Sequence, residues 1–257
     1  MAQQGFDYTA AQAYFPRGLV QPEGGYRFSA DALLLGCFLE PPPSKGGARL
    51  LDLGTGSGAV ALTMLCRFPS MRVVGVDIQS EYLAAAKANA MRLGFGRAFH
   101  ALCADILAPD VPLAAGSFDL ALANPPYRQR DRGRLPPAPA RLLALFEQPD
   151  TLAAFCRAAA LALRPGGRFG IIFPATRLDE LFRRLHDAGL VPRRVLRIHA
   201  RMGSPPRLLL VEAVKAEQKE GYQPIIDERS LALHPMDKGF SAEALAFCPF
   251  LAGRHIG

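Results

Sequence analysis

The sequence predicts an α/β protein with a mostly parallel, seven-stranded sheet and helices on both faces of that sheet. Short apolar segments, typical of buried strands, alternate with helical segments five times along the chain. Such an alternation is typical of parallel strands joined by right-handed crossovers. The chain has 257 residues, of which 50% are hydrophobic and 21% are charged, which is sufficient for one large domain with a buried core.

Seven segments are predicted to be strands because each is short, apolar and separated from the next by residues that favour turns. They are Arg49–Leu53, Arg72–Val76, Ala98–Cys103, Phe118–Ala123, Arg168–Phe173, Val195–Ile198 and Leu208–Val214. Tyr26–Phe28 is a candidate for a short additional strand.

Five helices are predicted between and beside these strands. They run from a Ser29 cap to Phe38, over Ala59–Arg67, from a Ser80 cap to Leu93, from an Asp150 cap to Leu163, and over Leu178–Ala188. The side chains of serine and aspartate at an N-cap accept hydrogen bonds from the first turn. Gly94, the sequence Arg-Pro-Gly-Gly at 164–167 and Gly189 are the expected stop signals.

The pattern divides the chain into three parts. Residues 1–48 precede the regular alternation, residues 49–215 contain it, and residues 216–257 form a tail that packs on the domain in this interpretation. The N-terminus has no basic start followed by an apolar core, so no signal peptide is expected. No apolar run approaches the length of a membrane span, so no membrane association is expected.

The five cysteines are scattered and include no Cys-x-x-Cys pair. We therefore expect free thiols in a cytoplasmic protein. His100 and Cys103 are close in sequence, but nothing nearby supplies two further ligands, so no metal site is predicted.

Positive charge is concentrated in one part of the chain. Between Arg128 and Arg207 there are 16 arginines, no lysine and six acidic residues, an excess of ten positive charges where the whole chain carries +7. This segment predicts contacts to phosphates of a nucleic acid. The candidate RNA-binding residues are Arg128, Arg130, Arg132, Arg134 and Arg141. The alternative is a set of solvated helix faces.

A glycine-rich turn follows the first strand of the alternating pattern. The sequence Asp-Leu-Gly-Thr-Gly-Ser-Gly, residues 52–58, allows the backbone to approach a ligand and to adopt positive φ. Asp52 lies at the end of the strand, where a buried carboxylate is costly unless it is paired. The amino group of a ligand is a suitable partner for it.

Asp77 and Asp105 follow the next two strands. A carboxylate at the second strand end suits a ribose diol, and one at the third suits the amino group of adenine. Three acidic strand ends around a glycine turn predict a site for a nucleoside with an amine and without a phosphate, since phosphate favours cations. S-adenosylmethionine has this composition.

The fourth strand ends in Asn-Pro-Pro-Tyr, residues 124–127. Proline has no N–H, so the turn offers the Asn124 oxygen and backbone carbonyls as acceptors without competing donors. Such a turn suits a planar amino group, whose two hydrogens it can hold while the nitrogen faces a methyl donor. Carbonyl dipoles would stabilise the positive charge that develops on this nitrogen. Tyr127 can stack on a flat ring.

These motifs, in this order, resemble those of Rossmann-like class I S-adenosylmethionine-dependent methyltransferases. In addition, Tyr26–Leu39 resembles the segment that lines the cofactor pocket in the bacterial tRNA(Val) adenine-N6 methyltransferase family. The resemblance extends to about Val214. It implies catalytic roles for Asn124, Pro125, Pro126 and Tyr127. It implies cofactor contacts for Asp31, Asp52, Gly54, Thr55, Gly56, Asp77, Ile78, Asp105, Ile106 and Asn124.

The resemblance implies methylation of an exocyclic amino group, with adenine N6 in tRNA as the favoured acceptor. Two alternatives remain open at this point. One is glutamine methylation of a release factor, which uses the same glycine turn and Asn-Pro-Pro-Tyr but normally has a longer N-terminal region. The other is an inactive fold that only binds RNA. The expected assembly is a monomer or a homodimer.

Overall fold

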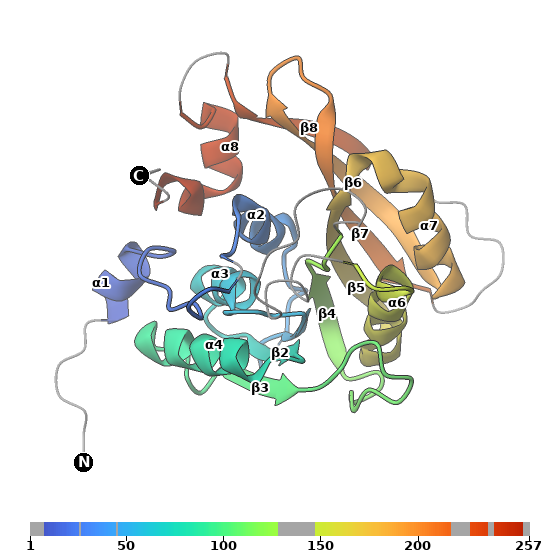
Figure 1. The fold of residues 1–257 in the computed structure, drawn as a ribbon, viewed down its shortest axis with the longest axis horizontal. Coiled ribbons are helices and arrows are strands. Elements are labelled where there is room, and N and C mark those ends of the chain that lie inside the picture. Colours follow the sequence, from blue (N-terminus) through green and yellow to red (C-terminus); the bar gives the residue numbers. More distant parts are fainter. Residues whose placement is uncertain are drawn as a thin grey trace.

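One eight-stranded sheet runs through the described part of the chain (Figure 1). The computed structural model describes residues 8–25, 27–44, 46–127, 147–216, 227–235 and 239–253. The strand order is β3-β2-β1-β4-β5-β7-β6-β8. The strands are β1 Arg49–Leu53, β2 Arg72–Asp77, β3 Phe99–Cys103, β4 Phe118–Ala123, β5 Leu163–Pro174, β6 Leu190–Arg201, β7 Pro206–Lys215 and β8 Asp227–His234.

The first five strands in chain order are parallel, and the later ones are mixed. β7 is antiparallel to both of its neighbours, β5 and β6, whereas β8 is parallel to β6. The chain order reverses at β1 and β4, where β2 and β3 extend to one side and β5 to the other. In open α/β sheets the ligand lies at the carboxyl ends of the strands at such a reversal.

The prediction of seven strands was wrong, because β8 adds an eighth at the sheet edge. The apolar residues of β8 are limited to Leu231, Ala232 and Leu233 after four polar residues, a run too short to indicate a strand, and only Leu231 is buried. The candidate strand near Phe28 was also wrong. Tyr26 lies outside the described residues, and Arg27 and Phe28 are not in a strand; the Phe28 N–H donates to the Gln21 side chain at 2.9 Å.

Helices cover both faces of the sheet. The helices are α1 Tyr8–Ala13, α2 Ala30–Phe38, α3 Ala59–Arg67, α4 Ser80–Arg92, α6 Thr151–Ala162, α7 Leu178–Asp187 and α8 Ala242–Phe247, with short 3-10 helices at Ala175–Arg177 and Pro249–Gly253. Side chains of α2, α3 and α4 pack in one core and those of α6 and α7 in a second. Successive strand residues point to opposite faces, so Leu50 enters the first core and Leu51 the second.

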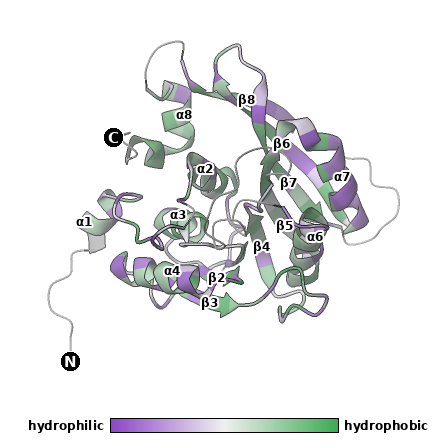
Figure 2. Cartoon of the chain, viewed as in Figure 1, coloured by the Kyte–Doolittle hydropathy of each residue, from purple (hydrophilic) through white to green (hydrophobic). Residues whose placement is uncertain are grey.

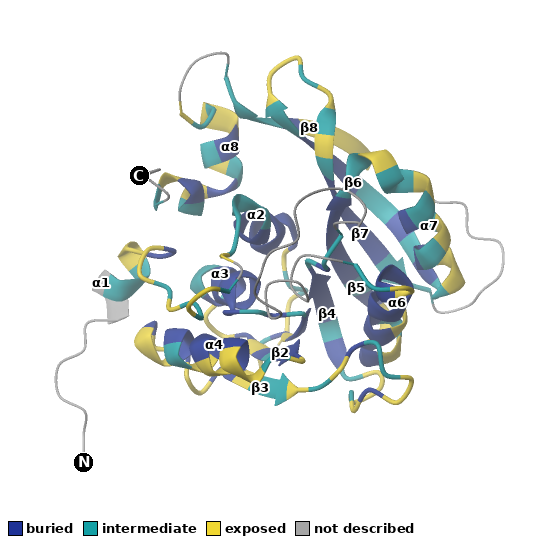
Figure 3. Ribbon diagram, in the orientation of Figure 1, coloured by how far each residue is buried: buried dark blue, intermediate teal, exposed yellow. Residues whose placement is uncertain are grey.

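The burial pattern follows this layering. Figure 3 shows the central strands largely buried, whereas α7 is mixed, and only Leu181 and Leu185 of that helix are buried. Figure 2 shows the hydrophilic residues that α7 carries beside its apolar ones. Helix α7 is therefore amphipathic and packs on the sheet through one stripe. No described helix combines the length and the apolar character that crossing a bilayer would require.

Two of the three predicted helix caps differ from expectation. The Ser29 hydroxyl accepts from the Asp31 N–H at 3.3 Å, as predicted. Ser80 is instead the first residue of α4, and Gln79 occupies the cap position without a side-chain bond. Asp150 occupies the cap of α6 with φ of 61° and forms no capping bond. Nearby, the Thr151 hydroxyl exchanges hydrogen bonds with the backbone of Gln148.

Helix α6 ends close to its predicted end at the Arg-Pro-Gly-Gly sequence. The next strand, however, begins before Arg168, where it was predicted to begin. Helix α6 ends at Ala162, and β5 begins at Leu163 with an irregular register. Leu163 pairs with Phe118 and Arg168 with Leu120, so residues 164–167 bulge opposite Asp119. The Arg164 Nε donates to Asp119 at 2.7 Å, which holds the bulge against β4.

Candidate cofactor and acceptor site

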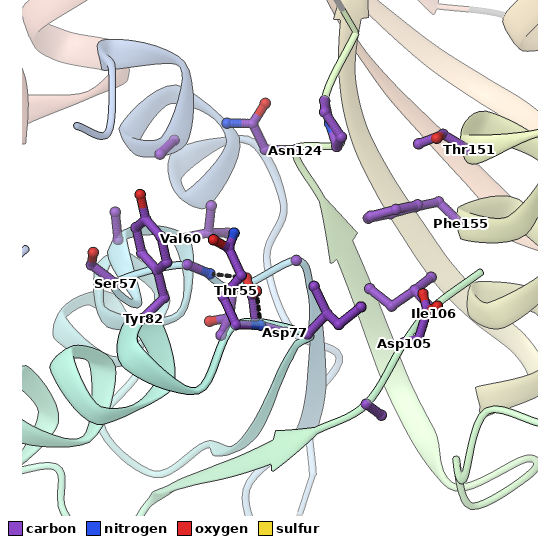
Figure 4. Close-up of a pocket in the computed structure, with 18 of the residues that line it drawn as sticks. Thr55, Ser57, Val60, Asp77, Tyr82, Asp105, Ile106, Asn124, Thr151 and Phe155 are labelled. Carbon is purple, nitrogen blue, oxygen red and sulfur yellow. Dashed lines mark hydrogen bonds between the residues drawn. The ribbon is translucent and has the colours of Figure 1, made fainter. Parts of the chain in front are cut away.

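A cavity lies at the carboxyl ends of β1, β2, β3 and β4, where the chain order of the sheet reverses (Figure 4). Nine predicted site residues line it: Gly54, Thr55, Gly56, Asp77, Ile78, Asp105, Ile106, Asn124 and Pro126. Four others, Asp31, Asp52, Pro125 and Tyr127, are not among the lining residues. The folded chain thus brings the glycine turn, two acidic strand ends and the Asn-Pro-Pro-Tyr turn to one cavity.

The glycine turn is held against β2 by backbone hydrogen bonds. The N–H groups of Gly54 and Thr55 both donate to the Val76 carbonyl, at 2.8 and 2.9 Å. Gly54 has φ of +70° and Gly56 has φ of +54°, backbone angles that are strained for residues with a side chain. A Cβ at Gly54 would also meet the Phe155 ring at 3.3 Å. Glycine at position 54 therefore serves both the turn and the shape of the cavity.

Asp52 stabilises the glycine turn through hydrogen bonds to the turn and to the start of α3. Its side chain is buried, and its Oδ2 accepts from the Thr55 hydroxyl at 2.7 Å and from the Ala61 N–H at 3.2 Å. Its Oδ1 is buried without a hydrogen-bond partner among the described residues. Direct contact between Asp52 and a ligand stays a prediction, whereas its bonds to Thr55 and the start of α3 are present in the structure.

Ionisation of Asp52 is expected to destabilise the ligand-free protein. Burial raises the pKa of Asp52 from 3.8 to about 7, against the opposing hydrogen bonds from Thr55 and Ala61. Because the folded-state pKa lies above the unfolded one, the protonated carboxyl stabilises the fold at low pH, and this stabilisation is lost as the pH rises through about 7. Between about pH 5 and about pH 8 the loss should be about 2–3 kcal/mol of unfolding free energy.

Urea denaturation of the parent and of Asp52→Asn at these two pH values measures this effect. The variant lacks the titrating carboxyl, so its unfolding free energy should change less over the same interval. Parallel pH profiles for the two proteins would mean that another group controls the dependence.

Asp77 connects the end of β2 to the glycine turn and to α4. Its Oδ2 accepts from the Gly56 N–H and its Oδ1 from the Gln79 N–H, both at 2.9 Å (dashed in Figure 4). Burial raises the pKa of Asp77 above 3.8, partly offset by these backbone hydrogen bonds. Each carboxylate oxygen has a second lone pair, so Asp77 can still accept from a ligand hydroxyl in the cavity.

Asp105 shapes the third strand end. Its Oδ1 accepts from the Leu107 N–H at 2.9 Å, and no backbone N–H of the described residues donates to the Oδ2, which is available at the cavity wall. Ile106, the next residue, is buried and lines the same cavity. This strand end therefore offers one acceptor beside an apolar side chain, which suits the edge and the face of a flat heterocycle.

The Asn-Pro-Pro-Tyr turn is partly in the cavity and partly in the core. Asn124 and Pro126 line the cavity, whereas Pro125 is buried. The Tyr127 hydroxyl donates to the Asp31 Oδ2 at 3.1 Å, and its ring meets Phe173 edge-on with centroids 6.4 Å apart. Asp31 thus connects the N-terminal part of the chain to this turn, and Tyr127 is oriented at both ends.

Arg177, which sequence reasoning missed, anchors the same turn from the 3-10 helix that follows β5. Its Nη1 donates to the Tyr127 carbonyl at 3.5 Å and to Glu147 at 2.6 Å, and its Nη2 donates to Glu180 at 2.7 Å. Hydrogen bonds to Glu180 and Glu147 raise the pKa of Arg177, so it stays charged. Its guanidinium lies over the Phe173 ring, 4.7 Å from the centroid. One cation therefore joins the backbone of Tyr127 to Glu147.

Several cavity residues carry no motif and come from helices. Figure 4 shows Tyr82 of α4 and Phe155 of α6 on opposite sides of the pocket, with Val60 of α3 and Thr151 of α6 around it. Their only signal in the sequence is their place within predicted helices, which does not indicate the face that they occupy. Within the described ranges, no three His, Cys, Asp or Glu side chains gather as metal ligands would.

This fold and site define a class I S-adenosylmethionine-dependent methyltransferase: a glycine turn and acidic strand ends surround a cavity at the sheet's reversal point, and β7 runs antiparallel between β5 and β6. Residues 44–228 match the family of methyltransferase domains. A tRNA1(Val) (adenine(37)-N6)-methyltransferase from Porphyromonas gingivalis is 32% identical over 84% of this chain and 85% of its own. The chain belongs to this methyltransferase family.

Other comparisons are consistent with the fold. A predicted O-methyltransferase from Agrobacterium tumefaciens has a TM-score of 0.66 and 19% identity, over 86% of this chain and 96% of its own. Geranyl diphosphate methyltransferase in complex with S-adenosylmethionine has a TM-score of 0.51 and 17% identity, over 73% and 85%. A release factor glutamine methyltransferase from Koribacter versatilis is 40% identical, but over only 37% of this chain and 32% of its own.

Proposed function

We propose that this enzyme methylates the N6 amino group of an adenine in tRNA. The observation that carries the proposal is the position of Asn124 and Pro126, which line the same cavity as Asp77 and Asp105. An acceptor turn for an amino group therefore adjoins a site suited to a nucleoside. The named activity of the Porphyromonas relative, which matches most of both chains, supports adenine 37 of tRNA1(Val) as the first acceptor to test.

The cofactor contacts follow from the three strand ends. Asp77 would accept from the ribose hydroxyls and Asp105 from the adenine amino group, with the adenine ring beside Ile106. The backbone of Gly54 and Gly56 would approach the methionine portion, and Ile78 and Thr55 would complete the wall. Bound S-adenosylmethionine would supply an electrophilic methyl group. Phe28 and Ala32 also line the cavity, so we assign residues 1–48 a part in closing this site.

Asn124 and the carbonyls of the turn would orient the acceptor. They accept both hydrogens of the planar amine, so that its nitrogen faces the methyl carbon. The cofactor held by Asp77 and Asp105 would supply the methyl group, with its sulfur–methyl bond as the one that breaks, and the methylated nitrogen would then lose a proton to water. The acceptor dipoles stabilise the charge on nitrogen before that loss. No strong base is required, because the alkylated nitrogen is acidic.

The experiment that tests this function is tritium transfer from labelled cofactor. Unmodified tRNA1(Val) transcript, total DNA and purified release factor are supplied separately, and modified nucleosides and amino acids are then identified. N6-methyladenosine in the transcript is the expected product. Label on a release-factor glutamine would retain the chemistry and replace the substrate, and label in none of the three would contradict the proposed activity.

The basic segment of the sequence after Tyr127 gives a separate prediction. Arg130, Arg132 and Arg134 lie outside the described residues, so their role rests on the sequence alone. Their replacement by alanine should lower the affinity for tRNA and leave cofactor affinity unchanged. The slope of log binding constant against log salt concentration should fall by the amount expected for the loss of up to about three phosphate contacts. A salt titration of tRNA binding measures the slope. An identical slope in variant and parent would mean that these arginines do not contact tRNA phosphates and only reflect the arginine-rich composition of the chain.

A further inference from the structure

A second cavity, of about 600 Å³, lies where the N-terminal segment meets the end of β8 and the C-terminal segment. Its described lining comes from residues 16–21 and 27–30, from residues 233, 234 and 240, and from Gly253. The volume is within the range of small-ligand sites. It is built by the segments before and after the βα units, and not by the glycine turn or the acidic strand ends.

This second cavity shares a lining residue with the first. Phe28 lines both cavities, so this residue forms part of the wall of each. Ala30 lines the second and Ala32 the first, at the start of the same helix, α2. Between them, Asp31 accepts the hydrogen bond from Tyr127 of the acceptor turn. A group in the second cavity would therefore be a neighbour of the amine that is methylated.

The described lining of the second cavity is basic. Arg17 and Arg27 line it, and no described Asp or Glu does. The Arg17 Nε donates to the Gly253 carbonyl at 2.5 Å, which holds that side chain at the rim. Arg27 is exposed and forms no ion pair with a described residue. Guanidinium groups without carboxylate partners favour a phosphate.

The same cavity has a flat, stacked wall. The rings of His234 and Phe240 are 4.9 Å apart and inclined by 22°. The His234 Nδ1 is 2.6 Å from the Gly239 carbonyl oxygen, which can only accept, so Nδ1 carries the hydrogen. In the neutral ring the Nε2 is then an acceptor for an amino group or a hydroxyl. Aromatic and imidazole faces are common stacking partners of unpaired bases in RNA.

We propose that this second cavity binds the nucleotide next to the target adenine. Stacked rings suit its base, and Arg27 and Arg17 suit its phosphate. The RNA backbone joins this nucleotide directly to the target nucleotide, so their two binding sites must be adjacent. The two cavities meet this requirement because both are lined by Phe28. The inference rests on the proposed RNA substrate and adds a subsite that selects for an unstacked strand around the target.

The test uses the full chain and a tRNA1(Val) transcript with either the normal nucleotide or an abasic residue on each side of adenine 37. His234→Ala should raise the KM for the intact transcript about tenfold, the scale of one lost stacked base, with kcat little changed. One of the two abasic transcripts should show the same increase with the parent enzyme. His234→Ala should add no further loss on that transcript, because the base it contacts is already absent.

Arg27→Ala tests the phosphate, and Arg229→Ala is its matched control, because Arg229 lies on β8 but pairs with Asp227 outside the cavity. Arg27→Ala should reduce the salt slope of tRNA binding by about one contact, and Arg229→Ala should not. Cofactor affinity, which reports folding, should be parental in all three variants. The subsite alone would be overturned if His234→Ala had a parental KM and Arg27→Ala a parental salt slope of tRNA binding. It would also be overturned if the loss from His234→Ala added independently to the loss from an abasic residue at each of the two flanking positions. A parent that does not methylate the transcript would overturn the proposed function and the subsite together.

Discussion

Replacement of Asn124 by alanine should reduce turnover by about a hundredfold or more while the protein stays folded. This is the scale expected when one pre-organised polar partner is removed from the reacting centre. The two prolines that follow end β4 without the amide, so folding should not depend on it. The side chain lines the cavity but lies on a different strand end from Asp77, so cofactor affinity should change little.

The measurement is single-turnover methyl transfer to tRNA1(Val) transcript, with calorimetry for the cofactor. Tyr127→Phe is the matched comparison on the same turn. It removes only the hydroxyl that donates to Asp31 and retains the ring against Phe173, so its effect on turnover should be far smaller. Parental turnover in Asn124→Ala would contradict the acceptor mechanism.

Replacement of Asp77 should produce the largest loss of cofactor affinity. Asp77→Ala should weaken S-adenosylmethionine binding by about 1–3 kcal/mol, because ligand hydroxyls are left unpaired. The structure adds a second cost, since the N–H groups of Gly56 and Gln79 also lose their acceptor. Asp77→Asn should also bind S-adenosylmethionine more weakly than the parent. Both carboxylate oxygens accept backbone N–H groups, so either orientation of the amide places its NH₂ against a donor.

Calorimetry with S-adenosylmethionine and S-adenosylhomocysteine measures this loss. Asp187→Asn, an exposed change on α7 away from the cavity, is the control and should bind with parental affinity. Asp105→Asn should be tolerated structurally better than Asp77→Asn, because among the described residues a backbone N–H donates only to its Oδ1. Unchanged affinity in both Asp77 variants would contradict the nucleoside site.

Sequence reasoning identified the positions that local chemistry determines. Buried strands are apolar wherever they occur in the chain, so β1 to β5 were recognisable before their partners were known. The glycines at 54 and 56 have backbone angles that other residues strain to adopt, and proline after Asn124 ends a strand by its own geometry. Family resemblance extended these motifs to a cofactor and an acceptor chemistry, and the comparisons confirm the methyltransferase family.

Only the tertiary structure decided which residues meet. It bonded the Asp52 carboxylate to Thr55 and Ala61, outside the lining of the cavity, and it placed Tyr82 and Phe155 on opposite walls. It paired β8 with β6 and joined Arg177 to the Tyr127 carbonyl, 50 residues away in sequence. The physical reason is that a strand or turn signal depends on neighbours in the chain. Edge pairing, the face that a helix residue presents and the partner of a buried charge depend on contacts between distant segments.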